Sequence, residues 1–190
     1  MNTALIGLDY IVDITHPSGR PARCAAHVAE RDVIAKANRA LAIAQQLQWL
    51  RILVKVGFEF GYADLPRQSP VFGRAEEYGA FALNGPGTHF HPDLRADLAN
   101  LVVVKPRVSP FYGTRLEAAL RANRIERVVL AGVSTTWAVQ AGARDAHDRD
   151  YEVWVLEEAC AAADEHEHKR SMGMLSGIAR LVTLEELERS

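Results

Sequence analysis

Apolar runs alternate with amphipathic stretches along the chain, which predicts strands that alternate with helices. The apolar runs predict strands over residues 3–8, 51–58, 100–106, 127–133, 151–157 and 181–183. Apolar residues at helical spacing, together with helix-start signals, predict helices over residues 28–48, 113–125, 135–150 and 164–180. We expect Thr135 to cap the third of these helices, and the acidic residues that open the fourth suit the positive end of a helix dipole.

Several of the predicted strands are continuous apolar runs, a pattern typical of a parallel sheet that is covered on both faces. We therefore expect an α/β fold: a three-layer, doubly wound, mostly parallel sheet with helices on both faces, of Rossmann-like type. The length of 190 residues and the 48% hydrophobic content predict one domain over residues 1–190. Residues 59–99 lack periodicity and collect Gly and Pro, so we expect them to form an active-site wall or a subunit contact.

Composition narrows the class of protein. The formal net charge of -2, from 22 basic and 24 acidic residues, argues against a nucleic-acid binder. No apolar run has the length of a membrane span. The start "MNTALIGLDY" lacks a basic region and a small-residue cleavage site, so we expect no secretory signal. The two cysteines, Cys24 and Cys160, make no disulfide framework and lack a setting that would activate a thiolate. We expect a cytoplasmic protein with a small-molecule substrate, and no cofactor, since there is no Gly-rich phosphate loop.

Ligands of parallel α/β sheets bind at the carboxyl ends of the strands, and two charged residues lie there. Asp9 follows the strand at 3–8, where poor solvation would raise its pKa and suit it to proton transfer. Alternatively, it is a cap or turn residue whose carboxylate accepts hydrogen bonds from nearby backbone N–H groups. Lys105 ends a buried strand and needs an acceptor, for which Asp9 is the natural partner; alternatively its ammonium group extends to solvent.

The turn "GVST" at residues 132–135 joins a strand directly to a helix. Backbone N–H groups at such a helix start stabilise developing negative charge, although the same residues also suit a plain turn. The position best placed to react, in the first turn of the helix, is Ala138, whose methyl group has no chemistry of its own.

Histidines suggest no metal site. His89 and His91 are spaced to lie on one side of an extended segment, as zinc ligands can, but no third ligand lies nearby. We expect both to be loop residues. His166 and His168 are predicted to lie on a solvated, charged helix start.

Aromatic side chains are expected to give the pocket flat apolar walls, unless half of them belong to the core or an interface. The candidates are Phe58, Phe60, Phe111, Tyr112 and Trp137. Arg67 and Arg74 could bring a forked donor to a carboxylate, or could be surface residues.

Residues 102–162 resemble the isochorismatase-like hydrolase family, also called the cysteine hydrolase superfamily. The matching pattern is a strand, Lys, Ser-x-Phe-x-x-Thr, a helix, a strand, Gly-Val-x-Thr, and a helix that ends in Ala-Arg-Asp-Ala. The resemblance extends from "ALIGLD" at the start to "HKRSMGMLSGIARLVT" near the end.

The resemblance implies that Asp9 and Lys105 match two members of the family's Asp, Lys and Cys set, and that the Cys position is Ala138. It also implies a cis peptide at Val133–Ser134, where backbone N–H groups would face an oxyanion. The ligands that zinc has in the nicotinamidase branch are missing after the strand at 51–58, so no metal is expected. We further expect a homo-oligomer, a dimer or a tetramer.

The implied activity is that of a hydrolase of a small, anionic or cyclic metabolite. Asp9 would act as the acid and base, as in members that lack the Cys and protonate a vinyl ether, with Lys105 as its partner and anion contact. A second interpretation is a Cys-dependent amidase whose nucleophile was replaced by Ala138. A third is a ligand-binding protein without turnover, and a fourth is a structural subunit whose site is filled by side chains.

Overall fold

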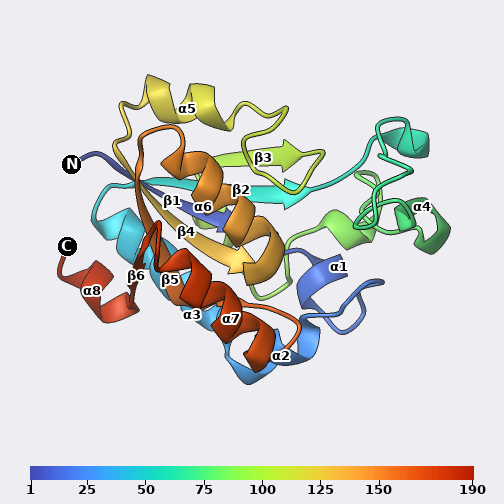
Figure 1. The fold of residues 1–190 in the computed structure, drawn as a ribbon, viewed down its shortest axis with the longest axis horizontal. Helices are drawn as coiled ribbons and strands as arrows, with labels where there is room; N and C mark the ends of the chain where they lie inside the picture. Colours follow the sequence, from blue (N-terminus) through green and yellow to red (C-terminus); the bar gives the residue numbers. More distant parts are fainter.

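Six parallel strands form one sheet at the centre of the molecule (Figure 1). The structure is a computed structural model that describes residues 1–190. The strands are β1 (Thr3–Leu8), β2 (Leu50–Val56), β3 (Leu101–Lys105), β4 (Arg127–Val133), β5 (Glu152–Ala161) and β6 (Arg180–Val182). Their order, β3-β2-β1-β4-β5-β6, reverses direction between β1 and β4, where open parallel sheets bind their ligands.

Helices cover both faces of the sheet, so the expected three-layer, doubly wound fold is confirmed. Helix α3 (Val33–Gln46) packs on β1, β2 and β5, whereas α6 (Gln140–His147) packs on β4 and β5. The other α-helices are α1 (Val12–Thr15), α2 (Ala25–Glu30), α4 (Ala75–Tyr78), α5 (Leu116–Ala122), α7 (Glu165–Leu175) and α8 (Leu184–Glu188). None of these helices could span a membrane.

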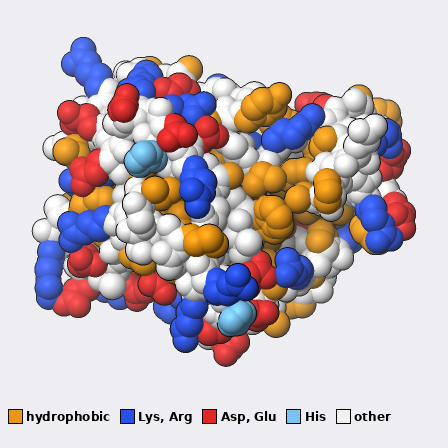
Figure 2. Space-filling view, in the orientation of Figure 1, with side chains coloured by type: hydrophobic (Ala, Val, Ile, Leu, Met, Phe, Trp, Pro, Cys, Tyr) orange, Lys and Arg blue, Asp and Glu red, His pale blue; other side chains and the backbone are white.

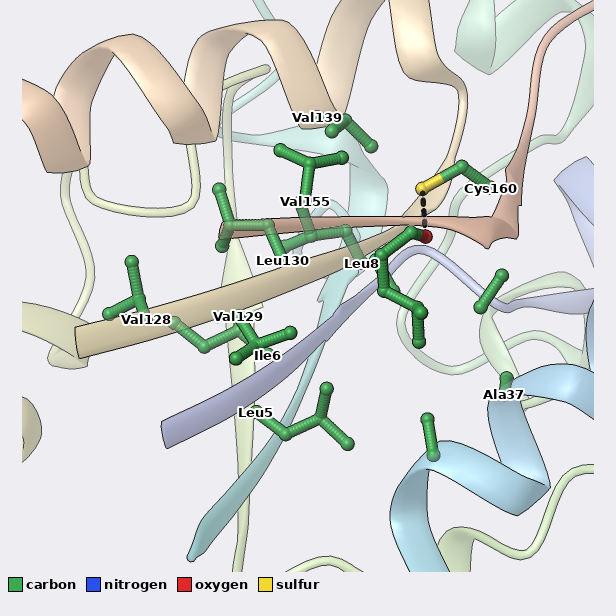
Figure 3. Packing of buried hydrophobic residues seen from close by; sticks show 14 of the residues in the cluster. Leu5, Ile6, Leu8, Ala37, Val128, Val129, Leu130, Val139, Val155 and Cys160 are labelled. Atoms are coloured by element: carbon green, nitrogen blue, oxygen red, sulfur yellow. Dashed lines mark hydrogen bonds between the residues drawn. The ribbon is translucent and has the colours of Figure 1, made fainter. Parts of the chain in front are cut away.

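The main core holds 45 buried residues on the two faces of the sheet. Leu130 and Val155 extend toward Val139 at the start of the α6 helix, whereas Leu5 extends toward Ala37 of α3 (Figure 3). Because neighbouring side chains of a strand point to opposite faces, a strand covered on both faces must be apolar at every position. This explains the continuous apolar runs of β1 and β4, whereas β3, at the edge of the sheet, leaves Val102 and Val104 exposed.

The helix expected over residues 28–48 is two helices, which corrects that prediction. Helix α2 ends at Glu30, and α3 begins at Val33 after Asp32, whose φ of 53° is left-handed. A right-handed helix cannot continue through this conformation. The guanidinium of Arg31, at the break, donates to the backbone oxygens of Glu157 and Cys160 in β5.

Strand β5 is longer than the predicted 151–157, because it continues past a register shift that lies opposite residues 130–132 of β4. Gly132 lies at this irregularity with a φ of 150°, and a Cβ there would be 2.3 Å from the backbone oxygen of Leu8. Only glycine therefore lets β4 approach β1 so closely at this turn.

The start of one helix and the presence of a last helix also differ from the prediction. Ser134, not Thr135, precedes a π-helical turn, η4 (Thr135–Val139), that leads into α6, and the Thr135 hydroxyl makes no hydrogen bond. The final helix, α8, was not predicted, although Thr183 and Glu186 form a capping box that the sequence displays.

The segment predicted to be irregular, residues 59–99, first forms a lobe beyond the carboxyl ends of the strands and then returns to the start of β3 (Figure 1). The lobe contains α4 and the short 3-10 turns η1 (Phe60–Tyr62) and η2 (Pro86–Thr88), whereas η3 (Ala96–Leu98) lies on the returning stretch and contacts α3. A second apolar cluster holds it together: Ile11, Val56, Phe58, Leu65, Phe72, Ala75, Ala80 and Phe81. The lobe thereby forms a wall over the strand ends.

Candidate active site

Asp9 and Lys105 form a buried ion pair at the carboxyl ends of the strands. Asp9 directly follows β1 with a left-handed φ of 56°, and Lys105 is the last residue of β3. Lys105 Nζ lies 2.7 Å from Asp9 Oδ2, and their side chains are 2% and 4% exposed. The Val56 N–H donates to Asp9 Oδ1 at 2.7 Å, and Lys105 Nζ donates to the Val108 backbone oxygen at 2.7 Å. The ends of β1, β2 and β3 thus hold both charges in one geometry.

The environment of Asp9 suits proton transfer. Burial raises the pKa of its carboxyl group above the ordinary value, and this effect is larger than the opposing ones. The opposing effects, which lower the pKa, are the positive charge of Lys105 and the hydrogen bonds from Lys105 and the Val56 N–H. Such a carboxyl group exchanges a proton more readily at moderate pH than an exposed one.

The turn after β4 faces the ion pair across the switch point of the sheet. The peptide bond between Val133 and Ser134 is cis, as the resemblance implies. Val133, Ser134, Trp137 and Ala138 line the same cavity as Asp9 and Lys105. The sequence-predicted positions in this turn are therefore brought together with the predicted charged residues.

The cavity has a volume of about 200 Å³, and ten of its fifteen lining residues are hydrophobic. Figure 2 shows hydrophobic side chains gathered on the surface between the sheet and the α4 lobe. The lining residues are Asp9, Ile14, Pro21, Arg23, Cys24, Val56, Val71, Phe72, Phe81, Lys105, Val108, Val133, Ser134, Trp137 and Ala138.

Four of the five predicted aromatic residues lie outside the cavity lining, which corrects that expectation. Phe58 is fully buried in the second cluster, where its ring packs edge-on against Phe72 at 5.5 Å, one layer away from the cavity. Phe60 is 83% exposed, and Tyr112, 64% exposed, lines a neighbouring groove. Phe111 stacks on Tyr151 in the main core.

Phe72 and Phe81 supply aromatic wall in their place, and sequence reasoning missed both because they lie in the segment without periodicity. Sequence reasoning also missed Cys24, which precedes α2 and lines the cavity. Burial raises the pKa of its thiol to about 11, so this cysteine stays protonated and is a poor nucleophile.

The remaining polar candidates lie away from the cavity. Arg67 and Arg74 are exposed and pair with Glu76 and Glu77. His89 is an exposed loop residue.

His91 stacks edge-on against His16, and no group of three His, Cys, Asp or Glu side chains is arranged to hold a metal ion. His168, predicted to be solvated, is fully buried, because α7 turns this side chain toward β5. His166 is exposed.

The sequence and the fold are similar to those of known proteins. Residues 3–186 match the isochorismatase domain. The isochorismatase family protein YecD of Escherichia coli O157:H7 is 30% identical over 192 residues, 97% of this chain and 94% of that protein. The ureidoacrylate amidohydrolase RutB of Acinetobacter baylyi is 35% identical over 81 residues, 42% of this chain and 33% of that enzyme.

The crystal structure of an isochorismatase family protein from Desulfovibrio vulgaris has the same fold, with a TM-score of 0.87 at 20% identity. The alignment covers 99% of this chain and 97% of that one. Fold and site together define an α/β protein of the isochorismatase-like hydrolase class. The match over almost the whole length shows that this chain belongs to the isochorismatase family.

Proposed function

We propose that this protein is a hydrolase of a small metabolite that moves protons through Asp9 and Lys105 and uses no cysteine nucleophile. The observation that carries the proposal is the buried Asp9–Lys105 pair at an apolar cavity. At the position where the family resemblance places a thiol, the cavity meets the methyl group of Ala138. A methyl group has no lone pair to attack a carbonyl, so a thioester at this position is not available.

In the proposed reaction, protonated Asp9 donates its proton to the substrate, as in the cleavage of a vinyl ether. Water attacks the resulting cation and returns one proton to Asp9, which gives a hemiketal or hemiacetal. Transfer of its hydroxyl proton to the ether oxygen then breaks the C–O bond and releases the alcohol and a carbonyl product. Lys105 fixes the orientation of the carboxyl group and stabilises its charged form. The homo-oligomer and the cytoplasmic location expected from the sequence stay predictions.

Asp9→Asn tests the proton-transfer role, because the amide keeps the shape of the carboxyl group but cannot exchange its proton. We expect turnover of the best substrate in a panel of vinyl ethers, esters and amides, isochorismate included, to fall by at least about 100-fold. Circular dichroism should show an intact fold. The matched control is Asp97→Asn, an exposed carboxylate on η3 that pairs only with Arg95. Wild-type rates in Asp9→Asn would remove Asp9 from the mechanism.

Ala138→Cys separates the proposal from its alternatives. Cleavage of a vinyl ether by the Ala138 form supports the cysteine-free route. Amidase activity that appears only in Ala138→Cys would instead indicate an amidase that lacks its nucleophile. Saturable ligand binding by both forms without product would indicate a binding protein.

A further inference from the structure

A groove lies next to the cavity and shares two of its lining residues, Phe72 and Val108. Three parts of the chain border the groove: the α4 lobe, the residues that follow β3, and α6. Its volume is about 490 Å³, and the exposed side chain of Tyr112 forms part of its wall. The groove is therefore a second place near the strand ends with room for a small molecule.

Arg107, two residues after Lys105, brings a positive charge to this groove. Its Nη1 donates to the backbone oxygens of Asp64, at 3.2 Å, and of Pro106, at 2.6 Å, and the guanidinium makes no ion pair. Its Nε and Nη2 make no hydrogen bond, and neither nitrogen is buried. The two backbone contacts thus fix the guanidinium and leave one of its edges open.

The other polar side chains of the groove leave this charge uncompensated. Asp145, the only acidic residue in the lining, already accepts the Ser109 hydroxyl at one carboxylate oxygen and pairs with Arg149 through the other. The Ser69 hydroxyl oxygen accepts two backbone N–H groups, so its own proton is free to be donated. The groove therefore presents free donors and one unpaired cation, a combination that suits an anion.

Elsewhere in this protein, the same edge of the guanidinium binds carboxylates. Nε and Nη2 of Arg74 donate to the two carboxylate oxygens of Glu77 at 2.9 and 2.8 Å. The same two nitrogens of Arg95 donate to both oxygens of Asp97 at 3.2 and 3.1 Å. A planar fork of this kind matches the two oxygens of one carboxylate, which makes the contact bidentate.

We propose that the groove binds a small organic carboxylate. Nε and Nη2 of Arg107 donate to its two oxygens, and its apolar part packs against Tyr112 and Phe72. The single charge of Arg107 balances one carboxylate, whereas a phosphate group would keep part of its larger negative charge without a partner. The site lies outside the cavity, so it does not depend on the function proposed above.

Two probes of almost the same shape test the choice of a carboxylate. Benzoate carries the carboxylate, and benzamide has a neutral amide in its place. We expect calorimetry at pH 7 to show that benzoate binds the wild-type protein at least about 10-fold more tightly than benzamide, because hydrogen bonds to charged groups are the stronger ones. Inorganic phosphate at the same concentration should not displace benzoate.

Arg107→Met tests the residue, because methionine keeps an apolar stem but has neither charge nor donor. We expect its affinity for benzoate to fall by at least about 10-fold, to that for benzamide. Arg107→Lys keeps the charge without the planar fork, so we expect it to bind benzoate about 2- to 10-fold more weakly than the wild type. Arg170→Met is the matched control, since Arg170 is an exposed arginine of α7 outside the groove lining.

Each contrary result overturns the proposal. Equal binding of benzamide, displacement by phosphate or undetectable binding of benzoate would exclude a carboxylate site. Wild-type affinity for benzoate in Arg107→Met would place the anion elsewhere, for example at Lys105, and an equal loss in Arg170→Met would indicate a general effect of charge. If Arg107→Met does not fold, wild-type affinity in Arg107→Lys is decisive. The proposed function fails separately, on the turnover of Asp9→Asn, so the two failures are distinguishable.

Discussion

Two buried polar clusters of this chain differ in how completely their members are paired. The strand-end pair, Asp9 and Lys105, has partners for both carboxylate oxygens and for the ammonium group. The histidine cluster, His27 and His168, lies between α2, α7 and β5, with ring centroids 5.8 Å apart. In the histidine cluster, both ring nitrogens of His27 have a hydrogen-bond partner, whereas those of His168 have none.

His27 is the partnered ring of the histidine cluster. Its Nδ1 lies 3.3 Å from the backbone nitrogen of Ala162, and its Nε2 lies 3.1 Å from Glu165. His168 has no hydrogen bond at either ring nitrogen, and its closest carboxylate oxygen, on Glu157, is 3.4 Å away. Burial, followed by the charge of Arg31, lowers the pKa of His168 below its usual range.

The difference between the clusters is in what each can do. The strand-end pair opens onto a cavity, so its charges can act on a bound molecule. The histidine cluster lines no part of that cavity, so we expect protonation of His168 to change the stability of the fold and not the charge at the cavity. We therefore expect a substitution to lower the free energy of unfolding most where every buried polar group of the cluster has a partner.

Lys105→Met should give the largest loss of stability, because it leaves the Asp9 carboxylate buried without its counter-charge. We expect the free energy of unfolding, measured by urea denaturation at pH 7, to fall by about 3–5 kcal/mol. The double variant Asp9→Asn, Lys105→Met should recover part of this loss, since no charge is then buried. A loss below about 1 kcal/mol in the single variant would show that the pair is not held as tightly as its geometry indicates.

His27→Leu should have an intermediate effect. It removes the acceptor of the Ala162 N–H and leaves that group buried, which costs about 1–3 kcal/mol. His166→Leu is the matched control, because His166 is an exposed histidine on α7. Equal stability of the two variants would mean that the Ala162 N–H finds another acceptor.

We expect the smallest change in the free energy of unfolding from acid pH, which acts on the protonation of His168. Its folded-state pKa is lowered from 6.5, so below about pH 6.5 the unfolded chain takes up a proton that the folded protein does not. Its contribution to stability is thus complete above pH 6.5 and is lost as the pH falls, by up to about 1.4 kcal/mol per pH unit.

The charged and titratable groups that face His168 are Arg31, Glu157, Glu165 and His27. His168→Gln should flatten the pH dependence of the unfolding free energy between pH 6.5 and 5. An unchanged slope in this variant would assign the acid sensitivity to another group.

Much of the sheet could be predicted, because most of the apolar positions in the sequence are positions that the structure buries. Strands β1 and β4 carry apolar residues at nearly every position, and the structure buries them on both faces. The apolar run of β3 also predicted a strand, although Val102 and Val104 are exposed at this edge of the sheet. The break at Asp32 and the extension of β5 to Ala161 could not be predicted. Both depend on contacts between segments far apart in the chain, such as Arg31 with β5.

The candidate site also has a part that could be predicted from the sequence and a part that could not. Asp9 and Lys105 could be placed together from the sequence, because the carboxyl ends of parallel strands meet at one edge of a sheet. The walls could not: Phe58 and Phe111 pack into the core, while Phe72, Phe81 and Cys24 line the cavity.

The sequence by itself determined the parallel sheet, the family and the two charged residues at its edge. These could be predicted because consecutive apolar residues mark each strand, and parallel strands bring their last residues to the same edge of the sheet. Only the tertiary structure decided which side chains close the cavity, which cations are already paired and that His168 is buried. Those outcomes depend on how the α4 lobe and the residues before α2 fold back over the strand ends, and such long-range packing leaves no periodic trace in the chain.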